Sequence, residues 1–179
     1  MKNQISNIIN IITLTVKQSP ETDRNKLIFL EKMLILSDNI VGERADVTDP
    51  SYNIEHIKDV FKFVDLTFND DILRFKVKNL IILLIKDYSV FIEKKYMQDI
   101  SNMKANFIES YNYMYCSEHY LKDFKFTAIQ EFSEFKKKLD PLIVEHSLVI
   151  CCMDAIVSIY KNKEKLKNKI ESFLKNPIF

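Results

Sequence analysis

Glycine is almost absent from this chain, since Gly42 is the only glycine in 179 residues. Tight β-hairpins, dinucleotide-binding fingerprints and P-loops normally need glycine, because it adopts positive φ without strain and lets a phosphate approach the backbone. These devices are therefore excluded in their usual forms. The remaining chain breaks come from proline, asparagine, aspartate and serine, which indicates a helical protein.

The chain also lacks an excess of charge of one sign. Lysine and arginine total 26 against 25 aspartates and glutamates, which leaves a net charge of +1. Such a balance gives no global attraction to nucleic acid or to an anionic membrane. The three cysteines show no repeating spacing, which excludes a disulfide framework and fits a reducing compartment.

Long uncharged apolar runs are missing as well. The apolar stretch at 2–17 is interrupted by asparagines and threonines, and no small-residue cleavage site follows it. The apolar segments 80–85 and 142–160 are too short or too charged to span a bilayer. We therefore expect a soluble, intracellular (cytoplasmic) protein with no signal peptide and no membrane span.

Apolar residues recur at spacings of three and four along most of the chain, which predicts amphipathic helices. The expected helices are 2–17, about 20–40, about 50–68, 72–95, 97–115, about 117–139, 142–160 and a last helix or continuation at 166–174. Hydrophobic residues make up 47% of the chain, which is enough for a packed core. No repeat of solenoid length is present.

Several helix ends carry their own signals. Ser19-Pro20, Asp49-Pro50 and Asp140-Pro141 each place a capping side chain before a proline, which predicts a helix start. Asn69-Asp70-Asp71 predicts a break and a new cap, and Gly42 lies where a glycine commonly follows a helix.

The second expected helix has one wide apolar stripe. Residues at spacings of three, four and seven predict a core-facing stripe of Leu27, Leu30, Leu34 and Val41. Three further apolar residues widen it, namely Ile28, Met33 and Ile35.

Two expected helices, about 72–95 and 142–160, are apolar around most of their circumference. Such helices are usually the buried centre of a bundle. We therefore predict an all-α single globular bundle of seven to eight helices, with these two helices largely buried, and a single helical domain over 1–179.

Two groups of residues could carry chemistry. Cys116 and His119 have the spacing of two zinc ligands or of a nucleophile and its base, but a zinc site needs two more ligands. Glu145, His146 and Asp154 are polar residues on an apolar helix, which leaves a helical ligand- or metal-binding enzyme as an alternative. Because no convergent catalytic set is visible, we expect no catalytic residue, no metal and no cofactor.

Two further features are interpreted as surface. His56 and Asp59 lie opposite the Ile54/Ile57 stripe and are expected to be solvent-exposed. Residues 161–175 contain six lysines and two glutamates, which could form a basic face for nucleic acid. No arginine follows Arg74, and lysine runs usually solubilise a terminal helix, so nucleic acid remains a minor alternative.

Tyrosine and methionine gather around the end of the fifth expected helix. Exposed tyrosine and methionine are typical of protein-binding surfaces. The expected partner-binding residues are Phe107, Tyr111, Tyr113, Met114, Tyr115 and Tyr120. We therefore expect a non-enzymatic protein-interaction module, such as an inhibitor, adaptor or immunity-type protein; its oligomeric state is not fixed by the sequence.

The stretch DPSYNIEHIKDVFKF, followed by an apolar helix containing NLIILLIKDY, resembles the middle of poxviral Bcl-2-like proteins. The resemblance implies a single helical domain with a buried central helix and a groove that takes an amphipathic helix. It leaves a Bcl-2-like viral inhibitor of apoptosis or of the host response as an alternative function.

Overall fold

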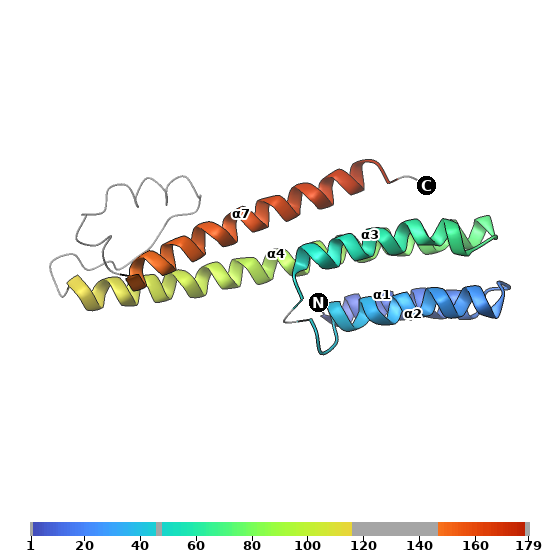
Figure 1. Ribbon diagram of the computed structural model, residues 1–179, viewed down its shortest axis with the longest axis horizontal. Helices are drawn as coiled ribbons and strands as arrows, with labels where there is room; N and C mark the ends of the chain where they lie inside the picture. Colours follow the sequence, from blue (N-terminus) through green and yellow to red (C-terminus); the bar gives the residue numbers. More distant parts are fainter. Residues whose placement is uncertain (1, 46–47, 116–146, 178–179) are drawn as a thin grey trace. The chain divides into compact units, whose positions relative to one another are not determined.

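The structure, a computed structural model, describes residues 2–45, 48–115 and 147–177, and within these ranges all side chains except those of 110–115 and 147–150. The described residues form five helices, α1 Lys2–Lys17, α2 Asp23–Ile40, α3 Pro50–Thr67, α4 Asp71–Tyr115 and α7 Ser147–Lys175 (Figure 1). The all-α class is confirmed. The expected number of seven to eight helices is not matched by these five, and the expected helix 117–139 lies outside the described residues.

Two pairs of expected helices are in fact continuous. The helices expected at 72–95 and 97–115 are both part of α4, because neither proline nor glycine interrupts residues 71–115. The segment 166–174 continues the helix that contains 147–160 as part of α7, which confirms the continuation that the sequence left open. As expected, α7 ends shortly before Pro177.

Neither long helix is buried all round, which corrects the prediction of two largely buried helices. Over 72–95, Val77 and Ile81 are buried, whereas Leu83 is 48% exposed. Over the part of 142–160 with described side chains, Met153 and Ile156 are buried, whereas Asp154 and Ser158 are exposed. Both segments therefore have an exposed side, and that of 72–95 carries apolar residues as well. In the described ranges, no helix combines the length and hydrophobicity that crossing a bilayer demands.

The chain divides into two compact units that share α4 and α7. The first comprises 1–92 and 166–179, and the second comprises 93–165. The expectation of a single domain is not tested by this division and stays a prediction.

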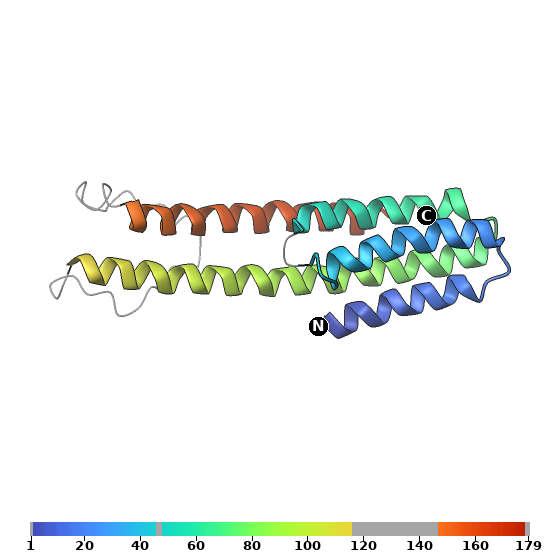
Figure 2. The ribbon, with the colours of Figure 1, turned by 60° about the horizontal axis from the view of Figure 1, so that its bottom comes forward.

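In the first unit, each of α1, α2, α3 and the first half of α4 runs antiparallel to the helix before it (Figure 2). The spacing of apolar residues in the sequence of α1 predicts a core-facing stripe of Ile5, Ile8, Ile9, Ile12 and Val16. This stripe is confirmed, since all five are buried except Ile8, which is half-buried. The last turns of α7 pack against α3, where the rings of Phe61 and Phe173 meet edge to face at 5.2 Å.

Two of the predicted helix starts are confirmed. Asp49 caps α3, with its side chain accepting a hydrogen bond from the backbone N–H of Ser51 at 2.7 Å, and Pro50 is the first helical residue. Asp70 caps α4 and accepts from the backbone N–H groups of Ile72 and Leu73. The side-chain oxygens thus satisfy donors that the first helical turn leaves unpaired.

The predicted start of α2 at Ser19-Pro20 is wrong by three residues. Thr22 is the cap, and its hydroxyl accepts from the backbone N–H of Asn25. The hydroxyl of Ser19 instead donates to the carbonyl of Val16 at the end of α1. Ser19 therefore finishes one helix rather than starting the next.

Glu21, between α1 and α2, is buried and holds the turn between α3 and α4. Its Oε1 atom accepts hydrogen bonds from the backbone N–H groups of Asn69 at 2.6 Å and Asp70 at 3.0 Å. These bonds, the one from Asp70 first, hold the pKa of Glu21 below its usual range despite the burial. The two inter-helix turns at this end of the unit are thereby tied together.

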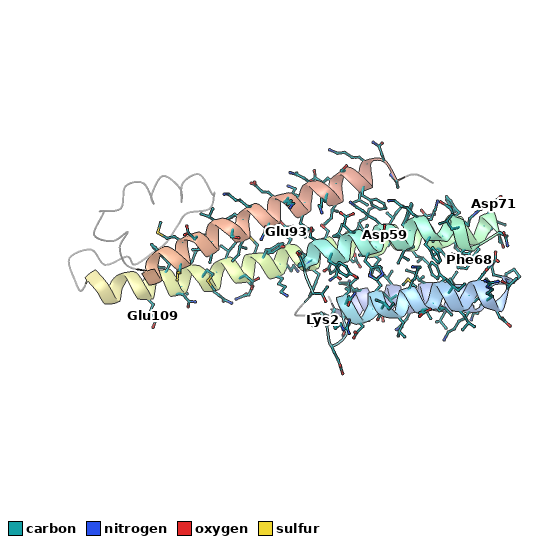
Figure 3. All side chains as sticks on the ribbon, in the orientation of Figure 1. Lys2, Asp59, Phe68, Asp71, Glu93 and Glu109 are labelled. Atoms are coloured by element: carbon teal, nitrogen blue, oxygen red, sulfur yellow. The ribbon has the colours of Figure 1, made fainter. Side chains whose placement is uncertain are left out.

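The core side of α2 is not the one predicted from the sequence. Phe29, Met33, Leu36 and Ile40 are 0–1% exposed. Phe29 packs on Phe68, with ring centroids 5.0 Å apart. Phe68, labelled in Figure 3, directly follows the last residue of α3. The predicted stripe of Leu27, Leu30, Leu34 and Val41 lies on another side of the helix. Burying the stripe that contains Phe29 removes more apolar surface from water than burying the predicted stripe would. The stripe that contains Phe29 therefore faces the core.

Gly42 follows the C-cap Val41, at the position predicted for it. A Cβ atom at Gly42 would lie 2.5 Å from the Oδ1 atom of Asp38 and 2.7 Å from its Cα atom. Glycine is thus required here by the close approach of the chain to the last turn of α2.

Polar groups also occur in the core of the first unit. The side-chain amide of Asn53, 1% exposed, donates to the Tyr88 hydroxyl at 2.9 Å and to the Asn39 carbonyl at 3.2 Å. The ammonium of Lys78, whose side chain is 3% exposed, pairs with Asp65 at 2.6 Å. The same ammonium lies 5.0 Å from the centre of the Phe61 ring. These contacts fix the pairing of α3 with α4.

In the second unit, α4 and α7 carry the described residues. Lys163 of α7 pairs with Glu93 of α4 at 3.4 Å and donates to the sulfur of Met97. Ile100 and Phe107 of α4 and Met153 of α7 are among its buried residues.

Candidate functional site

The structure describes only some of the residues of the tyrosine-rich surface predicted from the sequence. Phe107 is 0% exposed, so its ring belongs to the core and does not serve as an exposed binding residue. Tyr111, Tyr113, Met114 and Tyr115 lie in the last turns of α4, but their side chains are outside the described set. Tyr120 lies outside the described residues altogether. Apart from Phe107, this surface stays a prediction.

The candidate catalytic and metal-binding residues lie mostly outside the described residues. Cys116, His119, Glu145 and His146 lie outside the described residues. Among the residues that are described, no group of three or more histidine, cysteine, aspartate or glutamate side chains could hold a metal ion. Asp154 is exposed on α7.

The two neighbouring cysteines of α7 differ in environment. Cys151 is exposed and Cys152 is buried, and neither is in a disulfide. Burial, with a smaller effect of Cys151, raises the pKa of the Cys152 thiol. A raised pKa lowers the thiolate fraction, which disfavours a nucleophilic role for Cys152.

The lysines near the C-terminus are partly used in packing. Lys169 pairs with Glu55 of α3 at 3.1 Å and donates to the Ser51 hydroxyl. Lys167 pairs with Glu171 at 3.8 Å within α7, and Lys163 is paired as described above. These lysines are therefore neutralised by carboxylates, which weakens the case for a basic face that binds nucleic acid.

His56 is not the plain surface residue that the sequence predicted. It is half-buried on α3, with the Tyr52 ring 5.9 Å away, and its Nδ1 atom is buried without a hydrogen-bond partner in the described structure. Burial and the positive charge of Lys32 lower its pKa, while Asp59 acts in the opposite direction. Asp59 is exposed, as expected.

The strongest candidate site is the outward side of α2. Leu27 is 68% exposed, Ile28 39%, Leu34 71% and Ile35 47%, although the helix already buries a full apolar stripe. We call the exposed set Leu27, Ile28, Glu31, Leu34 and Ile35 the α2 surface. Exposed apolar residues gathered on one helix are characteristic of protein-binding surfaces, whereas single exposed ones are ordinary.

Other exposed apolar residues of the first unit are arranged differently. Leu66, at 82% exposure, ends α3, and Ile72 and Phe75 begin α4. They lie close in sequence to the Lys78–Asp65 ion pair and to the ion pair between Arg74 and Asp71. Ile72 and Phe75 are one-turn neighbours on α4, as are the exposed Ile11 and Leu14 on α1, but each of these sets has two members, whereas the α2 surface has four apolar members on one helix.

The charges around the α2 surface are sparse. The ammonium of Lys32 lies 4.6 Å from the centre of the Phe63 ring on α3. Asp38, two turns after Glu31, pairs with Arg44 at 3.5 Å. Within the described part of the chain, Glu31 has no ion pair and no hydrogen bond through its side chain, so its exposed carboxylate is not neutralised.

Sequence reasoning identified the apolar residues of this surface and assigned them to the core. The signal that points to a surface is their number: α2 has apolar residues on three sides, more than one core can bury. Comparison with protein-family models, curated proteins and solved structures finds no match to this chain.

Proposed function

We propose that this protein is a non-enzymatic protein-interaction module that binds a partner through the α2 surface. The observation that carries the proposal is the outward position of Leu27 and Leu34, which are 68% and 71% exposed while Phe29 and Met33 fill the core. Removing these leucines from water by docking a partner is favourable at about 25 cal/mol per Å² of apolar area. A role as inhibitor, adaptor or immunity-type protein is consistent with such a module.

An intracellular setting is part of the proposal. It is supported by the thiol of Cys151, which is free and exposed. Free exposed thiols persist in reducing compartments and are oxidised elsewhere. The tyrosine-rich segment at the end of α4 remains a second, separate contact region in this proposal.

The test compares one pair of exposed leucines on α2 with a single exposed leucine on α3. A Leu27→Glu/Leu34→Glu variant places carboxylates on the α2 surface, and a Leu66→Glu variant places one on the equally exposed end of α3 as a control. Substitutions at exposed positions change stability little, so both variants are expected to unfold like the wild type. Tagged wild type, variant and control are used to capture partners from the source cells.

The expected result is a protein that is retained by the wild type and by Leu66→Glu and is lost with Leu27→Glu/Leu34→Glu. If the wild type and both variants retain the same protein, the contact lies outside the α2 surface. Capture of no protein by the wild type would contradict the proposed function itself.

A further inference from the structure

Glu31 has an unusual set of neighbours on α2. On a helix, the residues three and four positions before and after a given residue surround it on the surface. For Glu31 these are Leu27, Ile28, Leu34 and Ile35, and all of them are exposed. An exposed carboxylate therefore stands inside a ring of four aliphatic side chains.

The charge of Glu31 has no counterpart in the described structure. The nearest lysine in sequence, Lys32, lies over the Phe63 ring instead, at 4.6 Å from its centre. Arg24 and Asp38 lie two turns away on either side, and Asp38 is engaged by Arg44. A cation supplied from outside would be the first to neutralise Glu31.

We propose that the α2 surface receives an amphipathic helix of a partner protein whose apolar face carries an arginine at its centre. The inference rests on the proposed function and specifies the partner's chemistry. The aliphatic ring excludes water around the ion pair once the partner is docked, and an ion pair is stronger where water is excluded. Arginine suits the position because its planar fork can donate two hydrogen bonds to one carboxylate.

Charge also decides against a second copy of this chain as the occupant. A twofold contact between two α2 surfaces would bring the same residues together from both copies. Centred on the ring, it would place Glu31 against Glu31, and two like charges inside an apolar contact are unfavourable. The partner is therefore a different protein segment with a cation where this chain has Glu31.

The test uses two synthetic helical peptides of about 15 residues, long enough to hold a helix once bound. Both carry leucines three and four positions on either side of a central residue, which is arginine in one peptide and glutamate in the other. Binding to the full chain is measured by fluorescence anisotropy for wild type, Glu31→Lys and Glu164→Lys. Glu164 is an exposed glutamate of α7 and is the matched control. Circular dichroism checks that each variant is folded.

The arginine peptide is expected to bind the wild type at least about tenfold more tightly than the glutamate peptide. Glu31→Lys should reverse that order, and Glu164→Lys should leave it unchanged. Equal affinities for the two peptides, or no binding of the arginine peptide to the wild type, would overturn the inference. Self-association of the wild type that Leu34→Glu abolishes would also overturn it, in favour of a second copy.

Failure of this inference is distinguishable from failure of the proposed function. If capture from the source cells depends on Leu27 and Leu34 but is unchanged by Glu31→Lys, the surface binds a partner without an arginine contact. If the wild type captures no protein, the proposed function fails first.

Discussion

The side chain of Glu21 accepts a hydrogen bond from the backbone N–H of Asp70 at 3.0 Å, which ties the turn after α1 to the turn before α4. The contact joins residues 49 positions apart in sequence, and the same oxygen also accepts from Asn69. Because Asp70 in turn caps α4, Glu21 positions the residue that starts the longest helix.

Glu21→Ala is therefore expected to lower the free energy of unfolding by about 1 kcal/mol, since two part-buried N–H groups lose their acceptor. Glu21→Gln keeps an acceptor oxygen and should cost less. The folded-state pKa of Glu21 is lowered. The carboxylate of Glu21 therefore contributes to the free energy of unfolding above the usual glutamate pKa range, and this contribution is lost as the pH falls through the folded-state pKa. Urea unfolding from neutral to acidic pH measures this, and equal pH dependence of wild type and Glu21→Gln would contradict it.

His56 is expected to make stability depend on pH in a higher range. Burial and Lys32 lower its folded-state pKa, so the unfolded chain takes up the proton more readily. His56 therefore contributes stability above the usual histidine pKa. This contribution is lost as the pH drops from about 7 toward 5. A His56→Gln variant, which stays neutral, should show a flatter profile in urea unfolding. A variant profile as steep as that of the wild type would contradict the assignment.

The pairing of Lys78 with Asp65 predicts an asymmetry between two substitutions. The lysine side chain is 3% exposed and that of Asp65 is 48% exposed. Asp65→Ala leaves a buried ammonium without this partner and is expected to cost about 2 kcal/mol, whereas Lys78→Met keeps the apolar stem and should cost less. Thermal unfolding of the two variants and of the double variant measures the difference. A larger loss in Lys78→Met than in Asp65→Ala would contradict the expectation.

The contact of Phe61 with Phe173 predicts that the end of α7 stabilises the first unit. Phe173→Ala removes an edge-to-face ring contact and is expected to lower the free energy of unfolding by about 2 kcal/mol. Phe75 is 63% exposed, so Phe75→Ala is the matched control and should change stability by less than about 0.5 kcal/mol. Similar losses in the two variants would contradict this packing.

Local signals in the sequence predicted much of the first unit. The α1 stripe from Ile5 to Val16 and the caps at Asp49 and Asp70 depend on neighbouring residues alone, and the structure confirms them. The cap at Ser19 failed, since its hydroxyl bonds back to the Val16 carbonyl, and the neighbouring Glu21 accepts from a turn far away in sequence. Such a long-range contact leaves no periodic signal in the chain.

The α2 surface could not be assigned from periodicity, because two apolar stripes compete on one helix. Phe29 and Leu34 both belong to helical repeats, and only packing on α3 decides that Phe29 enters the core. The break expected near residue 96 failed for a related reason, and of the two possibilities left open for 166–174 the continuation is the correct one. Polar residues there are tolerated within one long amphipathic helix.

The central claim is that the outward side of α2 binds a protein. It is tested most directly by placing a photo-cross-linking residue at position 34 of the full chain in the source cells, and at position 66 as the control. The account predicts one dominant protein adduct from position 34 that is absent from position 66. No adduct at position 34, or the same adducts from both positions, would contradict it.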